Sequence, residues 1–90
     1  MIKQARLLVS GDVIGVGFRA WTKYQSKFVK VYGWVRNIGD KVEVLLQGEE
    51  EDIKNMIDRI KKGTPVSNVT GVEVVWEDTK ETFDTFEIKK

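Results

Sequence analysis

The residues best suited to chemistry lie in a glycine-rich stretch, residues 11–19, between a predicted strand and a predicted helix. Glycine permits positive φ, so consecutive backbone N–H groups of such a loop can turn toward one point. The helix that follows adds its unpaired N-terminal amides and the positive end of its dipole. Arg19 falls in the first turn of that helix, where a cation opposes the dipole, so its presence indicates an anion between the two. We therefore predict an anion-binding loop rather than a plain connection.

Two other motifs share part of this pattern. Gly15, Gly17 and Ala20 fit the G-x-G-x-x-A dinucleotide fingerprint, but a dinucleotide site needs a larger parallel sheet than this chain can build. Residues 15–18 echo the glycine–aromatic part of an RNA-recognition motif, which lies on a strand within a basic surface. Here the residues lie in a loop and the net charge is only +1, so neither alternative is favoured.

A second candidate, Asn37, stands at the end of a predicted strand. Apolar runs and turn signals predict elements in the order strand, helix, strand, strand, helix, strand, strand. The second helix is opened by residues 49–52 and closed by residues 61–63. The other elements are a first strand at 5–10, a first helix at 18–30, a hairpin of strands at 31–37 and 41–47, and late strands at 69–77 and 83–89.

This order predicts an α+β, ferredoxin-like split βαβ sandwich, with an antiparallel sheet of four to five strands and two helices on one face. A right-handed crossover makes the first two strands parallel, with the third strand between them. Their carboxyl ends then lie at the same edge of the sheet, about 10 Å apart. The glycine-rich loop and Asn37 should therefore meet at this edge. We expect the 90 residues to form a single domain, 1–90, because so short a chain cannot divide its apolar residues between two cores.

Most aromatic side chains are predicted to belong to the hydrophobic core. Trp21, Tyr24 and Phe28 recur at helical spacing and should form the buried face of the first helix. Trp34 should pack in the core rather than wall the site. Trp76 and Phe86 should pack between the sheet and the helices.

The composition limits the catalytic groups, metal ligands and partners that the chain can have. The chain has no cysteine and no histidine, which excludes thiol chemistry and removes the usual zinc and copper ligands. The acidic run at residues 49–52 is interpreted as a first helical turn, where carboxylates favour the dipole, rather than as a metal site. With 15 basic and 14 acidic side chains, nothing favours nucleic acid or membranes as partners. No segment approaches the ~20 apolar residues of a membrane span, and no signal-peptide core opens the chain. We expect a cytoplasmic monomer that needs no metal and no cofactor.

Two motifs resemble those of the acylphosphatase family. VSGDVIGVGFR at residues 9–19 is similar to its first signature and GWVRN at residues 33–37 to its second, and Gly48, residues 62–65 and residues 86–88 fit its layout. The resemblance implies a ferredoxin-like, cofactor-free enzyme that hydrolyses the carboxyl-phosphate anhydride of acyl phosphates. It also implies that Asn37 positions the attacking water. The phosphoryl group would be bound by Arg19 and by the amides of Ile14, Gly15, Val16, Gly17 and Phe18.

The chain departs from that family at three places. Ile14 stands where the family usually has glutamine, and Asp12 where it usually has a basic residue. The turn at residues 38–40 is one residue shorter than usual. A loop that binds through backbone donors does not depend on a side chain at Ile14, whereas a carboxylate at Asp12 should weaken the binding of a phosphate.

The absence of histidine is consistent with this reaction. The leaving group is a carboxylate whose conjugate acid has a pKa near ~4, so it departs without being protonated. Phosphoryl transfer usually passes through a loose transition state, so the attacking water needs orientation more than deprotonation. An amide can orient that water, while a guanidinium and backbone amides stabilise charge on the phosphoryl oxygens.

Three other functions fit part of the sequence. The first is a non-catalytic ferredoxin-like module that binds anions or metabolites, for which a water-positioning Asn37 has no use. The second is a nucleic-acid-binding domain, which the charge balance disfavours. The third is a domain of larger carbamoyl-phosphate-using maturation proteins, but the chain has the length of the domain alone, so we expect a free-standing enzyme.

Overall fold

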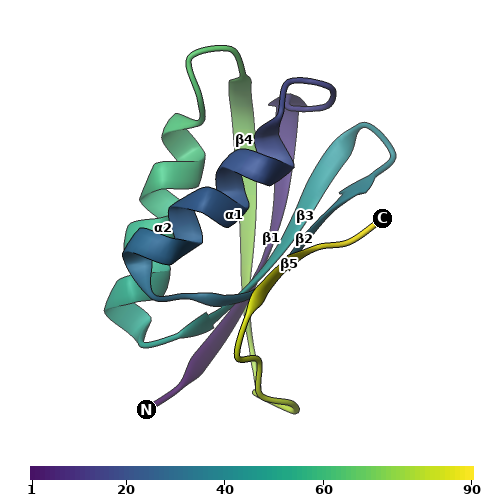
Figure 1. Cartoon of the computed structure of the whole chain (residues 1–90). Coiled ribbons are helices and arrows are strands. Elements are labelled where there is room, and N and C mark those ends of the chain that lie inside the picture. Colours follow the sequence, from purple (N-terminus) through teal and green to yellow (C-terminus); the bar gives the residue numbers. More distant parts are fainter.

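A computed structural model describes the whole chain, residues 1–90 (Figure 1). It contains five strands and two helices in the predicted order. Their bounds are β1 Lys3–Asp12, α1 Phe18–Val29, β2 Tyr32–Ile38, β3 Lys41–Gly48, α2 Glu50–Lys62, β4 Asn68–Glu77 and β5 Phe86–Ile88.

The five strands form one sheet in the order β4-β1-β3-β2-β5. β1, β2, β3 and β4 pair in antiparallel fashion, as predicted, whereas β5 pairs with β2 in parallel, so the five-stranded sheet is mixed. The parallel pair arises because the chain leaves β4 at one edge and crosses to the opposite edge before β5. The ferredoxin-like α+β plan itself is confirmed.

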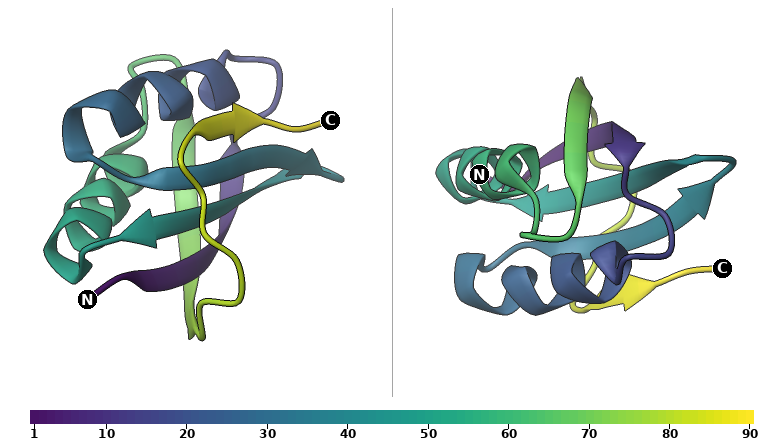
Figure 2. Two further views of the ribbon diagram at one scale, coloured as in Figure 1. Left: turned by 60° about the horizontal axis from the view of Figure 1, so that its bottom comes forward. Right: turned by 90° about the horizontal axis from the view of Figure 1, so that it is seen from above.

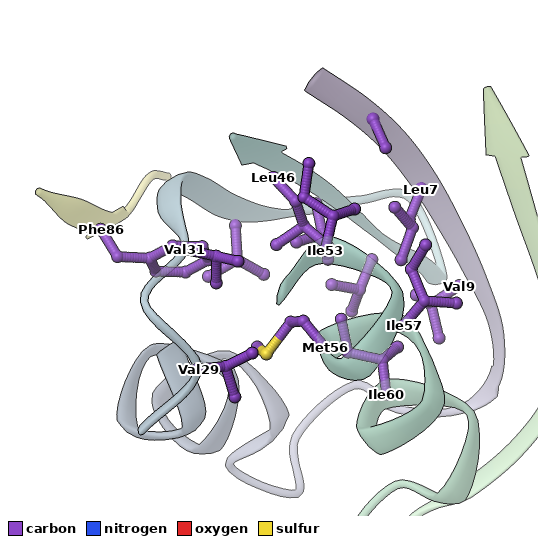
Figure 3. Packing of buried hydrophobic residues seen from close by; sticks show 14 of the residues in the cluster. Leu7, Val9, Val29, Val31, Leu46, Ile53, Met56, Ile57, Ile60 and Phe86 are labelled. Atoms are coloured by element: carbon purple, nitrogen blue, oxygen red, sulfur yellow. The ribbon is translucent and has the colours of Figure 1, made fainter. Parts of the chain in front are cut away.

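Both helices cover the same face of the sheet, as Figure 1 shows. The side chains between the two layers form the main core (Figure 3). β1 and β3 contribute alternate residues, as a strand with one buried face should, and α2 contributes a stripe at helical spacing. The core includes Ala5, Leu7, Val9, Val42, Val44, Leu46, Ile53, Met56, Ile57 and Ile60. Neither helix has the length and apolarity needed to cross a membrane.

The buried face of α1 differs from the predicted one. Phe18, Thr22, Ser26 and Val29 are buried, while Trp21 is only partly buried. The other two predicted core residues, Tyr24 and Phe28, are more than half exposed and pack edge to face on each other at 5.0 Å. Small hydroxyl residues can be buried here because Thr22 donates to the Phe18 carbonyl at 2.8 Å and Ser26 to the Lys23 carbonyl at 2.6 Å.

Of the three other aromatic residues that were predicted to pack in the core, Trp76 is the one that is not buried. Phe86 is buried in the main core, as expected. Trp76 is 45% exposed, because β4 is an edge strand that the helices cover only in part. Trp34 is buried, but it lies on the sheet face away from the helices, where Arg6, Arg36 and Lys89 place their cationic groups 4.9–5.7 Å from its ring centroid.

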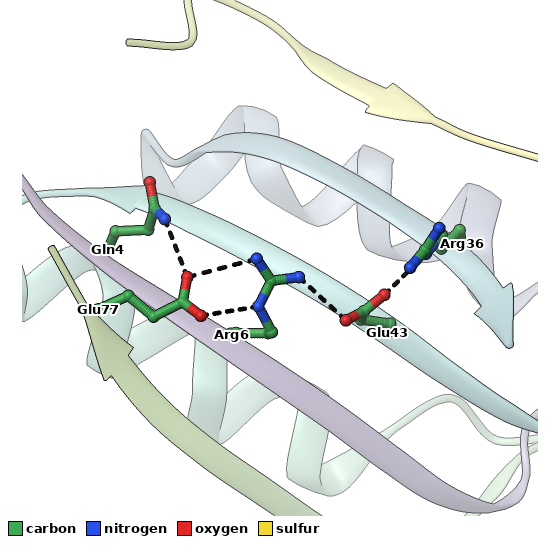
Figure 4. A network of polar contacts seen from close by, with 5 residues as sticks. All are labelled: Gln4, Arg6, Arg36, Glu43 and Glu77. Carbon is green, nitrogen blue, oxygen red and sulfur yellow. Dashed lines mark hydrogen bonds and ion pairs between the residues drawn. The ribbon is translucent and has the colours of Figure 1, made fainter. Parts of the chain in front are cut away.

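The sheet face away from the helices carries a network of charged side chains (Figure 4). Glu43 accepts hydrogen bonds from Arg36 at 2.7 Å and Arg6 at 3.0 Å, and Arg6 also donates to Glu77 at 2.8 Å. Burial alone would raise the pKa of Glu43, but the hydrogen bonds from Arg36 and Arg6 outweigh it and lower that pKa below its usual range. Hydrogen bonds from Arg6 and then Gln4 lower the pKa of Glu77 in the same way.

The segment that joins β4 to β5, residues 78–85, crosses this face of the sheet (Figure 2). Gln47, which is buried, fixes it from β3: its side chain accepts from the Phe83 amide at 2.8 Å and donates to the Glu81 carbonyl at 2.7 Å. Phe83 therefore bonds to a side chain instead of a neighbouring strand. For this reason β5 is shorter than the predicted strand at 83–89.

Candidate active site

The glycine-rich loop ends in a helix that begins without a side-chain cap. Gly15 and Gly17 adopt left-handed conformations with φ of 76° and 75°, which other residues rarely take. Gly17 is the N-cap of α1, yet no side chain bonds to the first amides and the first turn contains no acidic residue. α2 differs, since its first turn contains Glu50, Glu51 and Asp52. The start of α1 is thus the helix end whose positive charge the chain leaves uncompensated.

The first amides of α1 are available to a ligand. The first hydrogen bond of the helix runs from the Trp21 amide to the Gly17 carbonyl at 3.0 Å. The amides of Phe18, Arg19 and Ala20 precede it and have no acceptor within the helix. Amides in this position are a common binding site for phosphate groups.

Arg19 is the arginine without a protein partner. The chain has four arginines. Arg6 and Arg36 bind carboxylates on the far face of the sheet, and Arg59 donates to Gln25 at 2.6 Å. Arg19 is half-buried in the first turn of α1 but forms no ion pair and no side-chain hydrogen bond. Its guanidinium can therefore bind an external anion in bidentate fashion.

Asn37 lies one residue before the end of β2 and pairs with Val42 of β3. Because side chains alternate along a strand, Asn37 is on the same face as Val35, which packs in the core beneath the helices. The side chain of Asn37 is half-buried and forms no hydrogen bond within the chain. The β1–α1 loop and the β2–β3 hairpin lie at the same end of the sheet (Figure 1), as the predicted topology requires.

A cavity of about 160 Å³ brings these residues together. Arg19 and Asn37 both line it, as do Gly15, Gly17 and Phe18 of the predicted binding loop. Ile14 and Val16 do not: Ile14 is 37% exposed and Val16 packs against the core. A role for the amides of Ile14 and Val16 in binding remains a prediction.

Three residues of the cavity wall were not predicted from the sequence. They are Val13, Ala20 and Ile88. Val13 and Ala20 flank the predicted loop residues, so their proximity could have been inferred. Ile88 could not, because it reaches the cavity only through the parallel pairing of β5 with β2, which the sequence pattern does not specify.

None of the three departures from the family pattern lines this cavity. Asp12 is the exposed last residue of β1 and does not line the cavity. The shortened turn consists of Gly39 and Asp40, between the ends of β2 and β3. Gly39 adopts φ of 63°, as a tight hairpin turn requires. The short turn leaves Asn37 at the cavity, so this departure does not remove it from the site.

A larger cavity of about 560 Å³ lies on the other face of the sheet. The 78–85 segment and Trp34 contribute to its lining, but none of the predicted site residues does. Its arginine, Arg6, is already paired with Glu77 and Glu43, so its charge is compensated within the chain. The smaller cavity is therefore the better candidate for anion chemistry. The carboxylates of the chain nowhere gather in a group of three that could hold a metal ion.

Comparison with known proteins identifies the family. The acylphosphatase family model matches residues 5–88. The chain belongs to the acylphosphatase family. An acylphosphatase of Syntrophobacter fumaroxidans is 40% identical over 87 residues, a match that covers 96% of this chain and 90% of that protein. An acylphosphatase of Bacillus licheniformis is 46% identical over 79 residues, which are 87% of this chain and 86% of that protein.

A solved structure supports the same family. The crystal structure of acylphosphatase from Bacillus subtilis superposes with a TM-score of 0.93 at 35% identity, and each chain is covered completely. The resemblance inferred from the two motifs is confirmed, as is the prediction of a hydrolase of the acylphosphatase type. These matches are full-length matches to free-standing acylphosphatases.

Proposed function

We propose that this acylphosphatase hydrolyses its substrate with Arg19 and the loop amides on the phosphoryl group and with Asn37 on the attacking water. One observation carries the proposal: the arginine that lacks a protein partner shares a cavity with Asn37 and with the uncapped start of α1. The left-handed Gly15 and Gly17 support a loop whose amides converge on an anion. The loop amides assigned to the phosphoryl group are those of residues 14–18.

The proposed reaction is an in-line displacement at phosphorus. The water oxygen forms a bond to phosphorus while the bond from phosphorus to the acyl oxygen breaks and leaves a carboxylate. The proton of the water passes to the phosphate product or to solvent. Charge on the equatorial oxygens is stabilised by the Arg19 guanidinium and by amides that are fixed before the reaction. The side-chain carbonyl of Asn37 accepts a hydrogen bond from the water and holds it in line.

A non-catalytic anion-binding module is the alternative. It would use the same loop and Arg19, and its ligand would be bound but not converted. The half-buried amide of Asn37 in the same cavity favours the enzyme, since anion binding alone needs donors and has no use for a group that accepts from water.

The decisive experiment is hydrolysis of benzoyl phosphate in the presence of EDTA by the wild type, Arg19→Ala and Asn37→Ala. Each substitution should lower kcat/KM by on the order of 10²–10³-fold, because each removes a contact that stabilises the transition state. Arg59→Ala and Asn55→Ala are matched controls on α2, outside the cavity, and should retain activity. Inactivity of the wild type together with phosphate binding would favour the non-catalytic module, and activity that EDTA abolishes would contradict the metal-free mechanism.

A further inference from the structure

The wall of the 160 Å³ cavity has a buried floor and an exposed rim. Among its apolar lining residues, Val13 and Phe18 are at most 2% exposed and form the floor. Ala20 and Ile88 line the cavity and also touch solvent, which places them at the rim. Ile88 is 41% exposed and is the one large apolar side chain there. A part of a ligand that extends from the cavity along β5 therefore contacts this side chain.

The backbone of β5 fixes the position of Ile88. Ile88 pairs with Val35 of β2 in parallel register, and the amide of Lys89 donates to the Val35 carbonyl at 2.8 Å. Since Ile88 and Val35 are aligned, Ile88 lies on the face of the sheet that also presents Asn37. The end of β5 is thus a wall of the site and does more than cover the edge of the sheet.

The cavity volume separates the two halves of an acyl phosphate. The cavity is small, at about 160 Å³. Its polar lining, formed by Arg19, Asn37 and the loop amides, is assigned to the phosphoryl group and the attacking water. The acyl group must then lie at the rim, beyond its carbonyl carbon, where it contacts Ile88.

The charge of the lining residues indicates which acyl groups fit. Arg19 is the one charged residue of the lining, and the phosphoryl group engages it. A second anionic group on the acyl part would meet the Ile88 side chain and would find no cation along the wall. An apolar acyl group instead gains from burial against Ile88.

We propose that Ile88 is a specificity-determining residue that makes this enzyme select acyl phosphates with an uncharged, apolar acyl group. The inference rests on the proposed function, because it assigns the phosphoryl group to Arg19 and the loop. The inference goes beyond the proposed function by giving β5 a role in the choice of substrate.

The test compares kcat/KM for acetyl phosphate, benzoyl phosphate and 4-carboxybenzoyl phosphate in the same enzyme preparations. The wild type should prefer benzoyl over 4-carboxybenzoyl phosphate by about tenfold or more. Ile88→Ala should reduce the preference for benzoyl over acetyl phosphate by about tenfold, as expected for the loss of an apolar contact in the transition state. Ile88→Lys should shift the preference toward the carboxylated substrate. Each ratio is independent of the fraction of folded enzyme, so a loss of stability does not obscure the result.

Ile38→Ala is the matched control. Ile38 is 45% exposed at the end of β2 and does not line the cavity, and any effect that it has through Asn37 acts on all three substrates alike.

The inference is overturned if Ile88→Ala leaves the ratios of the wild type unchanged. If the wild type hydrolyses none of the substrates, the proposed function fails. Affinities for benzoylphosphonate and acetylphosphonate, measured by calorimetry, then test the contact with Ile88 separately: their ratio should fall in Ile88→Ala, and an unchanged ratio overturns the inference.

Discussion

Arg19 and Asn37 line one cavity, although Arg19 lies in the first turn of a helix and Asn37 lies near the end of a strand. Neither side chain is held by a protein partner, so both can direct their polar groups into the cavity. Arg19 is the only charged residue among those that line it, and the lining contains no carboxylate, histidine, cysteine, tyrosine or lysine. The site therefore contains no group that could act as a general acid or base near neutrality.

A flat pH profile follows from this composition. The kcat for benzoyl phosphate should vary little between about pH 5 and 8, apart from ionisation of the substrate, because no lining residue titrates there. Initial rates at saturating substrate across this range would measure it. A steep bell-shaped profile would require an acid–base pair and would contradict the mechanism.

Asp12 should weaken substrate binding through its charge alone. It is exposed at the end of β1, outside the cavity, so its effect on a bound phosphate is screened and amounts to about 1 kcal/mol or less. Asp12→Arg should lower KM severalfold at low salt with little change in kcat, and the difference should shrink as salt is added. Asp58→Arg makes the same change of charge on an exposed part of α2 and should leave KM closer to that of the wild type. Equal KM values for the wild type and Asp12→Arg would refute the effect.

The charged network on the far face of the sheet should control stability in acid. The pKa values of Glu43 and Glu77 are lowered in the folded chain, so the stability that these carboxylates contribute is complete above their unfolded pKa, near 4.3, and is lost as the pH falls through their folded pKa. Glu43→Gln should reduce stability at pH 7. Its melting temperature should also fall less than that of the wild type between about pH 5 and 2.

The control for this experiment is Glu73→Gln, which removes an exposed carboxylate of β4 that forms no ion pair. Melting curves followed by circular dichroism at several pH values would provide the data. If Glu43→Gln loses as much stability in acid as the wild type does, the network does not account for the pH dependence.

Gln47 should matter for both stability and substrate binding. Gln47→Ala leaves the Phe83 amide and the side-chain oxygen of the buried Gln4 without their partner, which should lower the free energy of unfolding by about 1–3 kcal/mol. It also releases the 78–85 segment that leads into β5, so KM for benzoyl phosphate should rise. Denaturant unfolding and steady-state kinetics would measure the two effects. Gln25→Ala also loses a side-chain hydrogen bond, on α1, and should change stability less. Wild-type stability in Gln47→Ala would show that the segment does not depend on this residue.

The sequence predicted the order of the elements and the meeting of the loop with Asn37, because local patterns and the handedness of the crossover together determine both. It did not predict the rotation of α1. Trp21, Tyr24 and Phe28 have the spacing of a buried stripe, but the core selects the neighbouring stripe of Phe18, Thr22, Ser26 and Val29. Small side chains whose hydroxyls bond to the helix backbone can be buried without leaving a polar group unpaired.

The direction and the neighbour of β5 also could not be predicted from the sequence. Both depend on the path of residues 78–85 across the sheet, and Gln47 holds that path by donating to the Glu81 carbonyl and accepting from the Phe83 amide. A side chain far along the sequence thus holds the segment that leads into a three-residue strand, a contact that no local pattern encodes. For the same reason, Ile88 entered the site only when the structure was known.

The uncapped start of α1 couples ligand binding to the folding equilibrium. An anion that binds the folded loop and not the unfolded chain stabilises the folded protein. When the anion concentration exceeds the dissociation constant, the free energy of unfolding rises with the logarithm of that concentration. Inorganic phosphate, the product of the reaction, should therefore raise the melting temperature, so that thermal stability reports the occupancy of the site. A chain that supplied α1 with an acidic first turn, as α2 has, would be more stable when empty and would bind its anion less well.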